Sequence, residues 1–224
     1  MVRQYRQGLR AEQSAERRTR ILGAARALMS DADRFQVDEI ARRADVSVPT
    51  LYAHFGSKGG LLSALTAQIE QEAGLFEGFA RVWAATDGET ALRTMLRATL
   101  EFWAQAWTFI TFSLHVRRTD PEFGARIDRL DRSRLGHLVV ICRRLDQEGR
   151  LRPGATPETA ARLAFSLSTP YVYEAMVAFG RLPASKTTSL VTEAAAQAVI
   201  RAGTKPVRAD SIDWTALGLK PPVT

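Results

Sequence analysis

The sequence predicts an all-α protein with a small N-terminal helix-turn-helix domain and a larger helical domain after it. Apolar residues recur at spacings of three and four over most of the chain, which is the period of helices with one buried face. Runs that alternate apolar and polar residues, as half-buried strands do, are absent. The 224 residues, 46% of them hydrophobic, are enough to form a sizeable core.

The N-terminal helices follow from apolar spacing and from capping residues. A first helix is expected over about 14–30, where apolar residues form one stripe. A short second helix is expected over 37–44, and Asp45 should follow it in a turn conformation that Asp tolerates. A third helix should begin after Ser47, a good N-cap, with Pro49 in its first turn. A short helix, a tight turn and another short helix make a helix-turn-helix.

The helices become longer after Ser57, which should cap a fourth helix with Phe76 on its buried side. The segment over 92–114 is apolar on most sides, so we expect it to be buried on most sides. Asp120 should cap a long charged helix that ends near Glu148.

Two further helices are expected near the C-terminal end. The first should cover about 157–180, with a kink at Pro170 because proline removes a hydrogen bond and clashes with the preceding turn. The second should cover about 186–202, and residues 204–224 should form an irregular tail.

The chain is basic, with 31 Lys and Arg against 24 Asp and Glu, a net charge of +7. Residues 1–60 hold 11 basic and 7 acidic residues, so this first quarter carries +4 of the excess. Six arginines lie between residues 3 and 20. A basic N-terminal arm favours an anionic partner such as nucleic acid. A simply solvated start, or the arginine content of a GC-rich genome, is the alternative reading.

The remaining composition points to a cytoplasmic protein that is not an enzyme. The single cysteine, Cys142, forms no disulfide within the chain, which fits a reducing compartment. We find no signal peptide and no run of about 18 uncharged apolar residues, so no membrane partner is expected. No GxSxG, HExxH or P-loop motif is present. Three scattered histidines and one cysteine lack metal-ligand spacing, so neither a metal nor a cofactor is expected.

The stretch VSVPTLYAHFGSK predicts a helix with two functional faces. Leu51 and Phe55 are apolar at i and i+4, so they should pack the helix on its neighbours. The other face of such a helix can enter the major groove of DNA. Thr50 can then hydrogen-bond a base or offer a methyl group to thymine, whereas Val48 and Ala53 offer only apolar contacts.

Three donors on this stretch are placed to reach phosphate oxygens, namely Tyr52, His54 and Lys58. Backbone N–H groups at the start of the fourth helix add an anion site beside Lys58. The alternatives are that Tyr52 only packs against neighbouring side chains and that His54 has a structural role.

The segment FQVDEIARRADVSVPTLYAHFGSKGGLL resembles the DNA-binding domain of TetR-type transcriptional regulators. The resemblance covers about residues 14–65. It departs from the family pattern at Gln36, where a Thr or Ser is usual, and at Asp45, which replaces a Gly. The matching residues are Ile40, Ala41, Val46, Ser47, Thr50, Leu51, Tyr52, His54, Phe55, Lys58 and Leu61.

The resemblance implies roles for individual residues. The positions that would face bases are 48, 49, 50 and 53. Those that would contact phosphates are 52, 54 and 58. Asp38 would accept from a cytosine amino group, or it would only serve the helix dipole. The candidate DNA-binding residues are Gln36, Asp38, Ser47, Val48, Pro49, Thr50, Tyr52, Ala53, His54 and Lys58.

The resemblance also implies three parts: an arm and helix-turn-helix domain over 1–65, an effector-binding and dimerisation domain over 66–203, and a tail over 204–224. Two chains would pair through the last two long helices, and a small apolar effector would bind among aromatic residues. The alternative is that these aromatic residues are plain core. The candidate pocket residues are Phe102, Trp103, Trp107, Phe112, Tyr171, Tyr173 and Met176.

The function expected from the resemblance is that of a transcriptional regulator on double-stranded DNA. It would be a repressor that binds a palindromic operator as a homodimer and is released by a small apolar effector. The alternative is a helical protein–protein interaction module that keeps the fold without binding DNA specifically.

Overall fold

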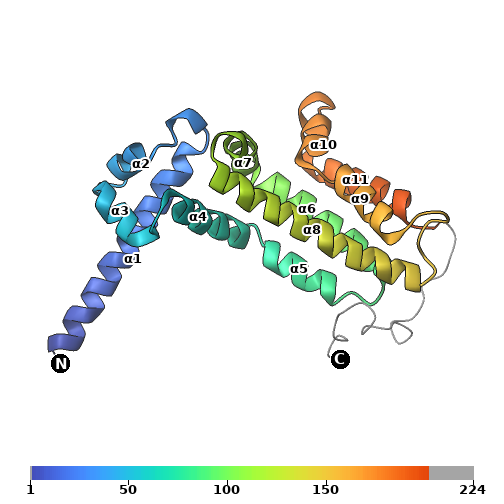
Figure 1. Ribbon diagram of the computed structural model, residues 1–224, viewed down its shortest axis with the longest axis horizontal. Coiled ribbons are helices and arrows are strands. Elements are labelled where there is room, and N and C mark those ends of the chain that lie inside the picture. Colours follow the sequence, from blue (N-terminus) through green and yellow to red (C-terminus); the bar gives the residue numbers. More distant parts are fainter. Residues whose placement is uncertain (1, 202–224) are drawn as a thin grey trace. The chain divides into compact units, whose positions relative to one another are not determined.

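The computed structural model describes residues 2–201, with side chains from residue 11 onward except that of Ala32. The expected tail over 204–224 lies outside these residues. Figure 1 shows that the described chain is built from helices. One isolated antiparallel bridge joins Leu151 to Ile200. Within the described residues, no helix combines the length and apolarity needed to cross a membrane.

The chain divides into two compact units. Unit 1 comprises Met1–Ile69 and Thr108–Ile127, and unit 2 comprises Glu70–Trp107 and Asp128–Thr224. Unit 1 therefore includes a second stretch of chain that the expected domain boundary at residue 65 assigns to the larger domain.

Unit 1 contains the helix-turn-helix. Its first helix is longer than the sequence predicts, since it begins at residue 2 rather than near 14. The turn before the third helix has Asp45 at φ 53°, the left-handed conformation expected there. The helices of unit 1 are α1 (Val2–Leu28), the 3₁₀ turn η1 (Ala32–Arg34), α2 (Val37–Arg43), α3 (Val48–Phe55), most of α4 (Lys58–Glu72), α7 (Trp107–Thr119) and the start of α8 (Pro121–Gln147).

Aromatic packing ties α7 and α8 to the helix-turn-helix within unit 1. The ring centroid of Phe112 lies 4.6 Å from that of Phe35 and 6.2 Å from that of Phe123. All three side chains are almost fully buried. The apolar segment over 92–114 is not one helix: α6 ends before Ala106, which leaves helical geometry at φ −107° and ψ 25°, and α7 follows. The apolar spacing continues across this break because both helices are buried, in different units.

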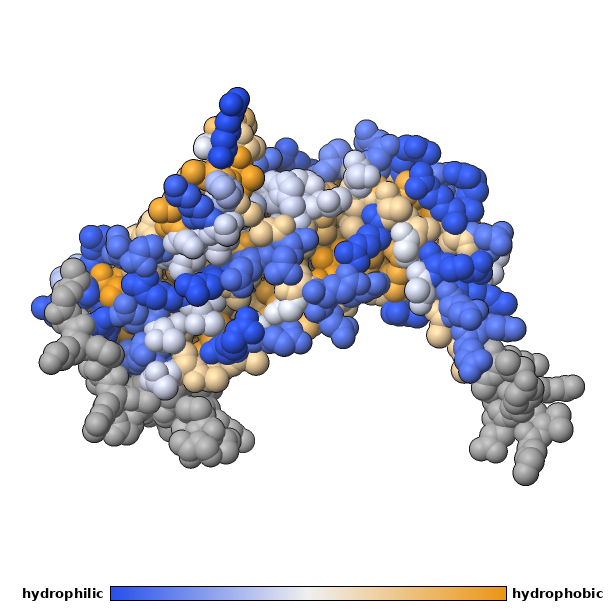
Figure 2. All heavy atoms as spheres, turned by 180° about the vertical axis from the view of Figure 1, so that it is seen from behind, coloured by the Kyte–Doolittle hydropathy of each residue, from blue (hydrophilic) through white to orange (hydrophobic). Residues whose placement is uncertain are grey.

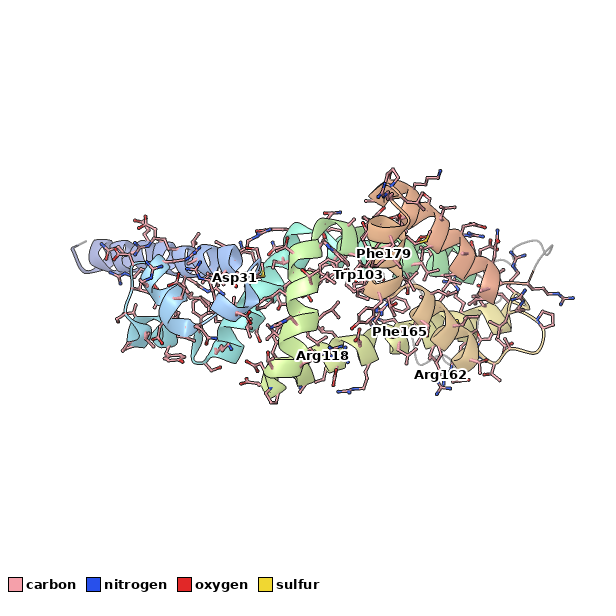
Figure 3. The ribbon with its side chains drawn as sticks, turned by 90° about the horizontal axis from the view of Figure 1, so that it is seen from above. Asp31, Trp103, Arg118, Arg162, Phe165 and Phe179 are labelled. Atoms are coloured by element: carbon pink, nitrogen blue, oxygen red, sulfur yellow. The ribbon has the colours of Figure 1, made fainter. Side chains whose placement is uncertain are left out.

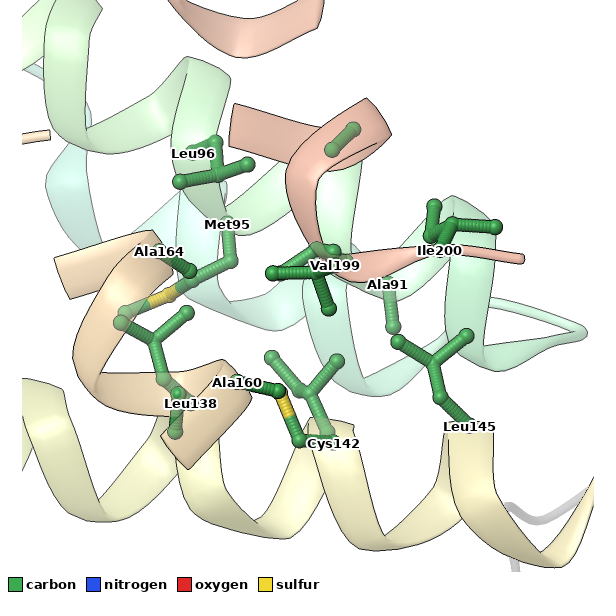
Figure 4. Close-up of a cluster of buried hydrophobic side chains, with 14 of the residues drawn as sticks. Ala91, Met95, Leu96, Leu138, Cys142, Leu145, Ala160, Ala164, Val199 and Ile200 are labelled. Carbon is green, nitrogen blue, oxygen red and sulfur yellow. The ribbon is translucent and has the colours of Figure 1, made fainter. Parts of the chain in front are cut away.

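Unit 2 holds the larger core. Its helices are α5 (Leu75–Trp83), α6 (Gly88–Gln105), the main part of α8, α9 (Pro157–Leu167), α10 (Pro170–Glu174), the π-helical η2 (Ala175–Phe179) and α11 (Ala184–Val199). Figure 4 shows part of the core that α6, α8, α9 and α11 form, with small residues such as Ala91, Ala160 and Ala164 beside Met95 and Leu138. Cys142 lies in this core, and burial raises the pKa of its thiol to about 12, as expected of an inert buried cysteine.

Two expectations for unit 2 are wrong. The fourth helix does not extend to Phe76: Gly74, at φ 63°, separates α4 from α5, and Phe76 is 56% exposed. The helix expected over 157–180 is not continuous. Thr169, which precedes Pro170, is extended at ψ 156°, because proline disfavours helical geometry in the residue before it. Three shorter helical segments result.

A buried ion pair closes the start of α6. The carboxylate of Glu148 accepts hydrogen bonds from the Gly88 N–H, at 3.0 and 2.9 Å, and from Arg144 Nε at 3.0 Å. Arg144 Nη1 donates to the carbonyl of Ala85 at 3.0 Å. Burial raises the pKa of Glu148, although the Gly88 N–H and Arg144 oppose the shift. The pair therefore fixes the loop before α6 to the end of α8.

Candidate DNA-binding interface

The third helix, α3, is positioned by its N-terminal cap. Ser47 Oγ accepts the backbone N–H of Thr50 at 3.3 Å, and the two hydroxyl groups lie 2.8 Å apart. Pro49 occupies the first turn, and Gly56, at φ 76°, ends the helix. The contact with Ser47 uses one hydrogen-bonding position of the Thr50 hydroxyl, which keeps others.

The structure gives α3 a buried face and a solvent face. Leu51 is fully buried, and Phe55 is half-buried beneath the guanidinium of Arg18, which lies 5.3 Å from the ring centroid. The solvent face holds the predicted DNA-binding residues. Ser47, Pro49, Tyr52 and Ala53 are exposed, and Val48, Thr50 and His54 are half-buried.

The side chain of Lys58 forms an ion pair with Asp120. Its Nζ lies 3.3 Å from Oδ2 of Asp120, while Oδ1 of Asp120 accepts the backbone N–H of Phe123 at 3.0 Å and caps α8. Burial would raise the pKa of Asp120, but the Phe123 N–H and Lys58 outweigh it, so this pKa lies below its usual value. No local pattern indicates this partner, because it lies more than sixty residues away along the chain.

The start of α2 departs from a well-capped helix. Gln36 is extended at φ −113° and ψ 146° and makes no side-chain cap, as the sequence predicts for a poor N-cap. Its Nε2 lies 3.5 Å from the carbonyl of Asp33, and the side chain is exposed. Asp38 is also exposed. Both residues are thus accessible in unit 1.

A cluster of arginines surrounds Glu39 on the same helix. Its carboxylate accepts from Arg42 at 2.7 and 2.8 Å, from Arg43 at 3.0 Å and from Arg34 at 3.3 Å. The hydrogen bonds from Arg42 and Arg43 lower the pKa of Glu39 to about 2. Glu39 therefore offsets the positive charge of these arginines beside α2.

The basic arm is only partly described. The side chains of Arg3, Arg6 and Arg10 lie outside the described residues, whereas Arg17 is exposed on α1. Arg20, also exposed, lies 3.9 Å from Asp45 in the turn.

The structure divides the candidate pocket residues between the two units. Phe112 belongs to the core of unit 1, and the other six belong to unit 2. There the rings of Phe102 and Trp103 lie 5.5 Å apart, and those of Trp107 and Tyr173 lie 5.4 Å apart.

The exposure of these six side chains differs. Phe102, Trp103 and Tyr173 are buried, Trp107 and Met176 are half-buried, and Tyr171 is 56% exposed. The predicted set is therefore split: Phe112 lies in unit 1, and the other six, which range from buried to exposed, lie in unit 2 and are called the aromatic group of unit 2 below.

A buried arginine adjoins this aromatic group. Arg134, on α8, is 8% exposed, and its guanidinium lies 3.9 Å from the ring centroid of Phe165 and 5.6 Å from that of Trp103. Figure 3 labels these two aromatic residues. The sequence does not single out Arg134, because α8 carries several arginines at similar spacing and others among them are exposed. Among the described residues, no cluster of His, Cys, Asp and Glu could hold a metal ion.

Comparison with known proteins agrees with this arrangement. Residues 21–65 match the family model described as bacterial regulatory proteins, tetR family. This match contains α2, α3 and the turn between them. No curated protein sequence matches the chain.

Several solved structures share the fold. The SmeT–triclosan complex has a TM-score of 0.66 at 21% identity, with 86% of this chain and 96% of that chain covered. NalD, the secondary repressor of the MexAB-OprM multidrug efflux pump in Pseudomonas aeruginosa, has a TM-score of 0.64 at 20% identity, covering 86% and 100%. The TetR-family transcriptional regulator PfmR from Thermus thermophilus has a TM-score of 0.59 at 20% identity, covering 80% and 97%. Residues 21–65 therefore match the tetR-family model, and the chain shares its fold with solved TetR-family transcriptional regulators.

Proposed function

We propose that this protein is a transcriptional repressor that binds a palindromic DNA operator as a homodimer and is released by a small molecule. The observation that carries the proposal is the solvent face of α3, inside the segment that matches the tetR family. The fold it shares with the repressor NalD supports repression over activation.

The side chains of α3 suggest how a sequence would be read. Thr50 offers a methyl group and a hydroxyl that already contacts Ser47, and Val48 and Ala53 are apolar. Such a face prefers thymine methyl groups to hydrogen-bonding base edges. Much of the affinity would then come from phosphate contacts, which weaken as salt rises.

Tyr52, His54 and Lys58 are the proposed phosphate contacts. Lys58 would exchange the Asp120 carboxylate for a phosphate oxygen, or contact both anions at once. Backbone N–H groups at the start of α4 supply further donors.

Pairing of two chains is supported by apolar side chains left exposed on the last helices of unit 2. Figure 2 shows apolar surface on the α10–η2 segment among hydrophilic residues. Two α3 helices would then meet successive major grooves about 34–36 Å apart. The exposed large apolar residues on α9, α10, η2 and α11 are Leu163, Tyr171, Phe179 and Leu190.

The aromatic group of unit 2 is the proposed effector site, with Phe102, Trp103, Trp107, Tyr173 and Met176 as its buried and half-buried members. That a protein of this fold is solved in complex with triclosan supports a small-molecule ligand. An effector releases DNA only if it binds the released form more tightly than the DNA-bound form.

A gel-shift experiment tests the DNA proposal. The purified chain should retard duplexes from the region upstream of its own gene at low salt, and the retardation should weaken steeply as salt increases. Lys58→Ala should weaken binding to every duplex alike, whereas Thr50→Ala should relax the preference at one base position.

Two outcomes would count against the proposal. If no duplex from that region is retarded at low salt, an interaction module that keeps the fold becomes the better reading. If Lys58→Ala leaves the affinity unchanged at every salt concentration, the phosphate assignment of Lys58 is wrong.

A further inference from the structure

The buried guanidinium of Arg134 is only partly satisfied. Its Nη1 donates to the carbonyl of Ser168 at 3.3 Å and to the hydroxyl of the same residue at 3.1 Å. Its Nε has no hydrogen-bond partner among the described residues. The carboxylate oxygen Oδ1 of Asp131 lies 3.8 Å from Nη2, which is too long for a hydrogen bond.

The unpartnered Nε and the Nη2 atom, which faces Asp131 at 3.8 Å, lie on one edge of the group. The Nε–H and one Nη2–H of a guanidinium point the same way and form the side-on fork that binds a carboxylate through two parallel hydrogen bonds. In Arg134 this is the edge that Ser168 does not use. The opposite edge, through Nη1, is held by the protein.

The surroundings of this edge are apolar and aromatic. Phe165 and Trp103 both contact the guanidinium through their rings, and Trp103 itself belongs to the aromatic group of unit 2. Burial lowers the pKa of Arg134 to about 10, with Asp131 opposing the shift, so the group stays charged at neutral pH. Asp131, at 3.8 Å, gives this buried charge an ion pair without a hydrogen bond, so the charge is only partly compensated. A bound anion that accepts hydrogen bonds would lower the remaining cost.

We propose that Arg134 anchors the acidic group of the effector, which is an amphipathic carboxylate whose apolar body packs against Trp103 and Phe165. The inference rests on the proposed effector site of unit 2 and changes its ligand from a purely apolar molecule to an apolar acid. Arg134 would hold the carboxylate through Nε and Nη2 while Nη1 keeps its bonds to Ser168.

Two fluorescent probes that differ by one anionic group test the site in the full chain without DNA. One is 8-anilino-1-naphthalenesulfonate, and the other is N-phenyl-1-naphthylamine, which has the same aromatic skeleton without the sulfonate. Decanoate and methyl decanoate then compete with the bound probe, which separates a carboxylate requirement from a general anion requirement. The variants are Arg134→Met, which keeps the length and removes the charge, and Arg132→Met, an exposed control on the same helix.

Arg134→Met should weaken binding of the sulfonate probe and of decanoate by about tenfold or more, because a charge-assisted hydrogen-bonded contact is lost. It should leave the neutral probe within about twofold, and Arg132→Met should change neither. Decanoate should displace the sulfonate probe better than its methyl ester does. If sulfonates bind but decanoate does not compete, the anion is not a carboxylate and the proposal is overturned.

Other outcomes also overturn the inference. Equal losses for both probes in Arg134→Met would show a purely structural role, and unchanged binding would show that the anion does not use this residue. Failure of the wild-type protein to bind either anion at roughly millimolar concentration has the same consequence. Because no DNA is present, these results are independent of the gel shift, so a functioning repressor without an acid site would be recognised as such.

Discussion

Two arginines of α8 are buried to a similar extent in unit 2 and have opposite surroundings. Arg144 is 5% exposed and donates a hydrogen bond from its Nε to the Glu148 carboxylate at 3.0 Å. Arg134 is 8% exposed, packs against aromatic rings and a carbonyl, and has its nearest paired carboxylate, Asp131, at 3.8 Å. The first charge is neutralised by the fold itself. The second charge has a longer ion pair with Asp131, and its Nε has no hydrogen-bond partner among the described residues. Burial alone therefore does not distinguish a structural arginine from a binding one, but the counter-ion does.

The largest expected effect is a loss of stability, and it should differ between substitutions of Arg144 and Arg134. Arg144→Met should lower the free energy of unfolding by about 3 kcal/mol or more, because it leaves Glu148 buried without its partner. Arg134→Met should cost about 1 kcal/mol, since Trp103 Nε1 still donates to the Ser168 carbonyl. Urea unfolding of both variants measures the difference. Equal losses would mean that both arginines are structural and would break the comparison.

A smaller effect is expected at Lys58, whose partner Asp120 is intermediate in burial. Asp120→Asn should keep the cap of α8, because Asn caps as well as Asp does, but it removes the anion that competes with phosphate. DNA affinity should rise for all sequences. The slope of log affinity against log salt concentration should become steeper by up to about one, the amount expected for one added phosphate contact. Titrations of one duplex at several salt concentrations measure both quantities.

Asp33→Asn is the matched control for this test, because Asp33 is an exposed acid of the same unit that is not among the candidate DNA contacts. A general loss of negative charge would raise the affinity of both variants alike. Weaker binding by Asp120→Asn alone would instead show that the carboxylate orients Lys58 toward DNA.

The smallest effect is expected at Glu39, where carboxylate and arginines are on the surface. Its pKa is about 2 in the folded protein against an ordinary 4.5, so its stabilising contribution is complete above pH 4.5 and is lost as the pH falls toward 2. Glu39→Gln should therefore lower the urea midpoint slightly at neutral pH and not at all near pH 2. A difference between wild type and variant that persists at the acid end would contradict this assignment.

The parts of the fold that depend on neighbouring residues were predictable from the sequence. Ser47, Pro49 and Gly56 define α3 through caps and a turn, and Asp45 takes its expected conformation. The solvent face of α3 follows from Leu51 and Phe55 alone, because helix periodicity assigns the two faces.

The parts that depend on distant residues were not predictable. Apolar spacing runs through Ala106 without a sign that α7 enters another unit, since both helices are buried. Likewise, no local pattern on α8 tells Arg134 from the exposed Arg132 two residues earlier. Its burial is decided by Phe165 and Trp103, which lie on other helices and meet it only in the folded chain.

The carbonyl of Ser168 has two donors, Trp103 Nε1 at 3.0 Å and Arg134 Nη1 at 3.3 Å. This duplication lowers the energetic cost of any movement of the guanidinium. If Arg134 turns toward another anion, the tryptophan still satisfies the carbonyl, and no buried acceptor is left without a hydrogen bond. The junction between α9 and α10 can thus tolerate a change in one of its contacts and remain intact, which is a property that a site of repeated ligand exchange needs.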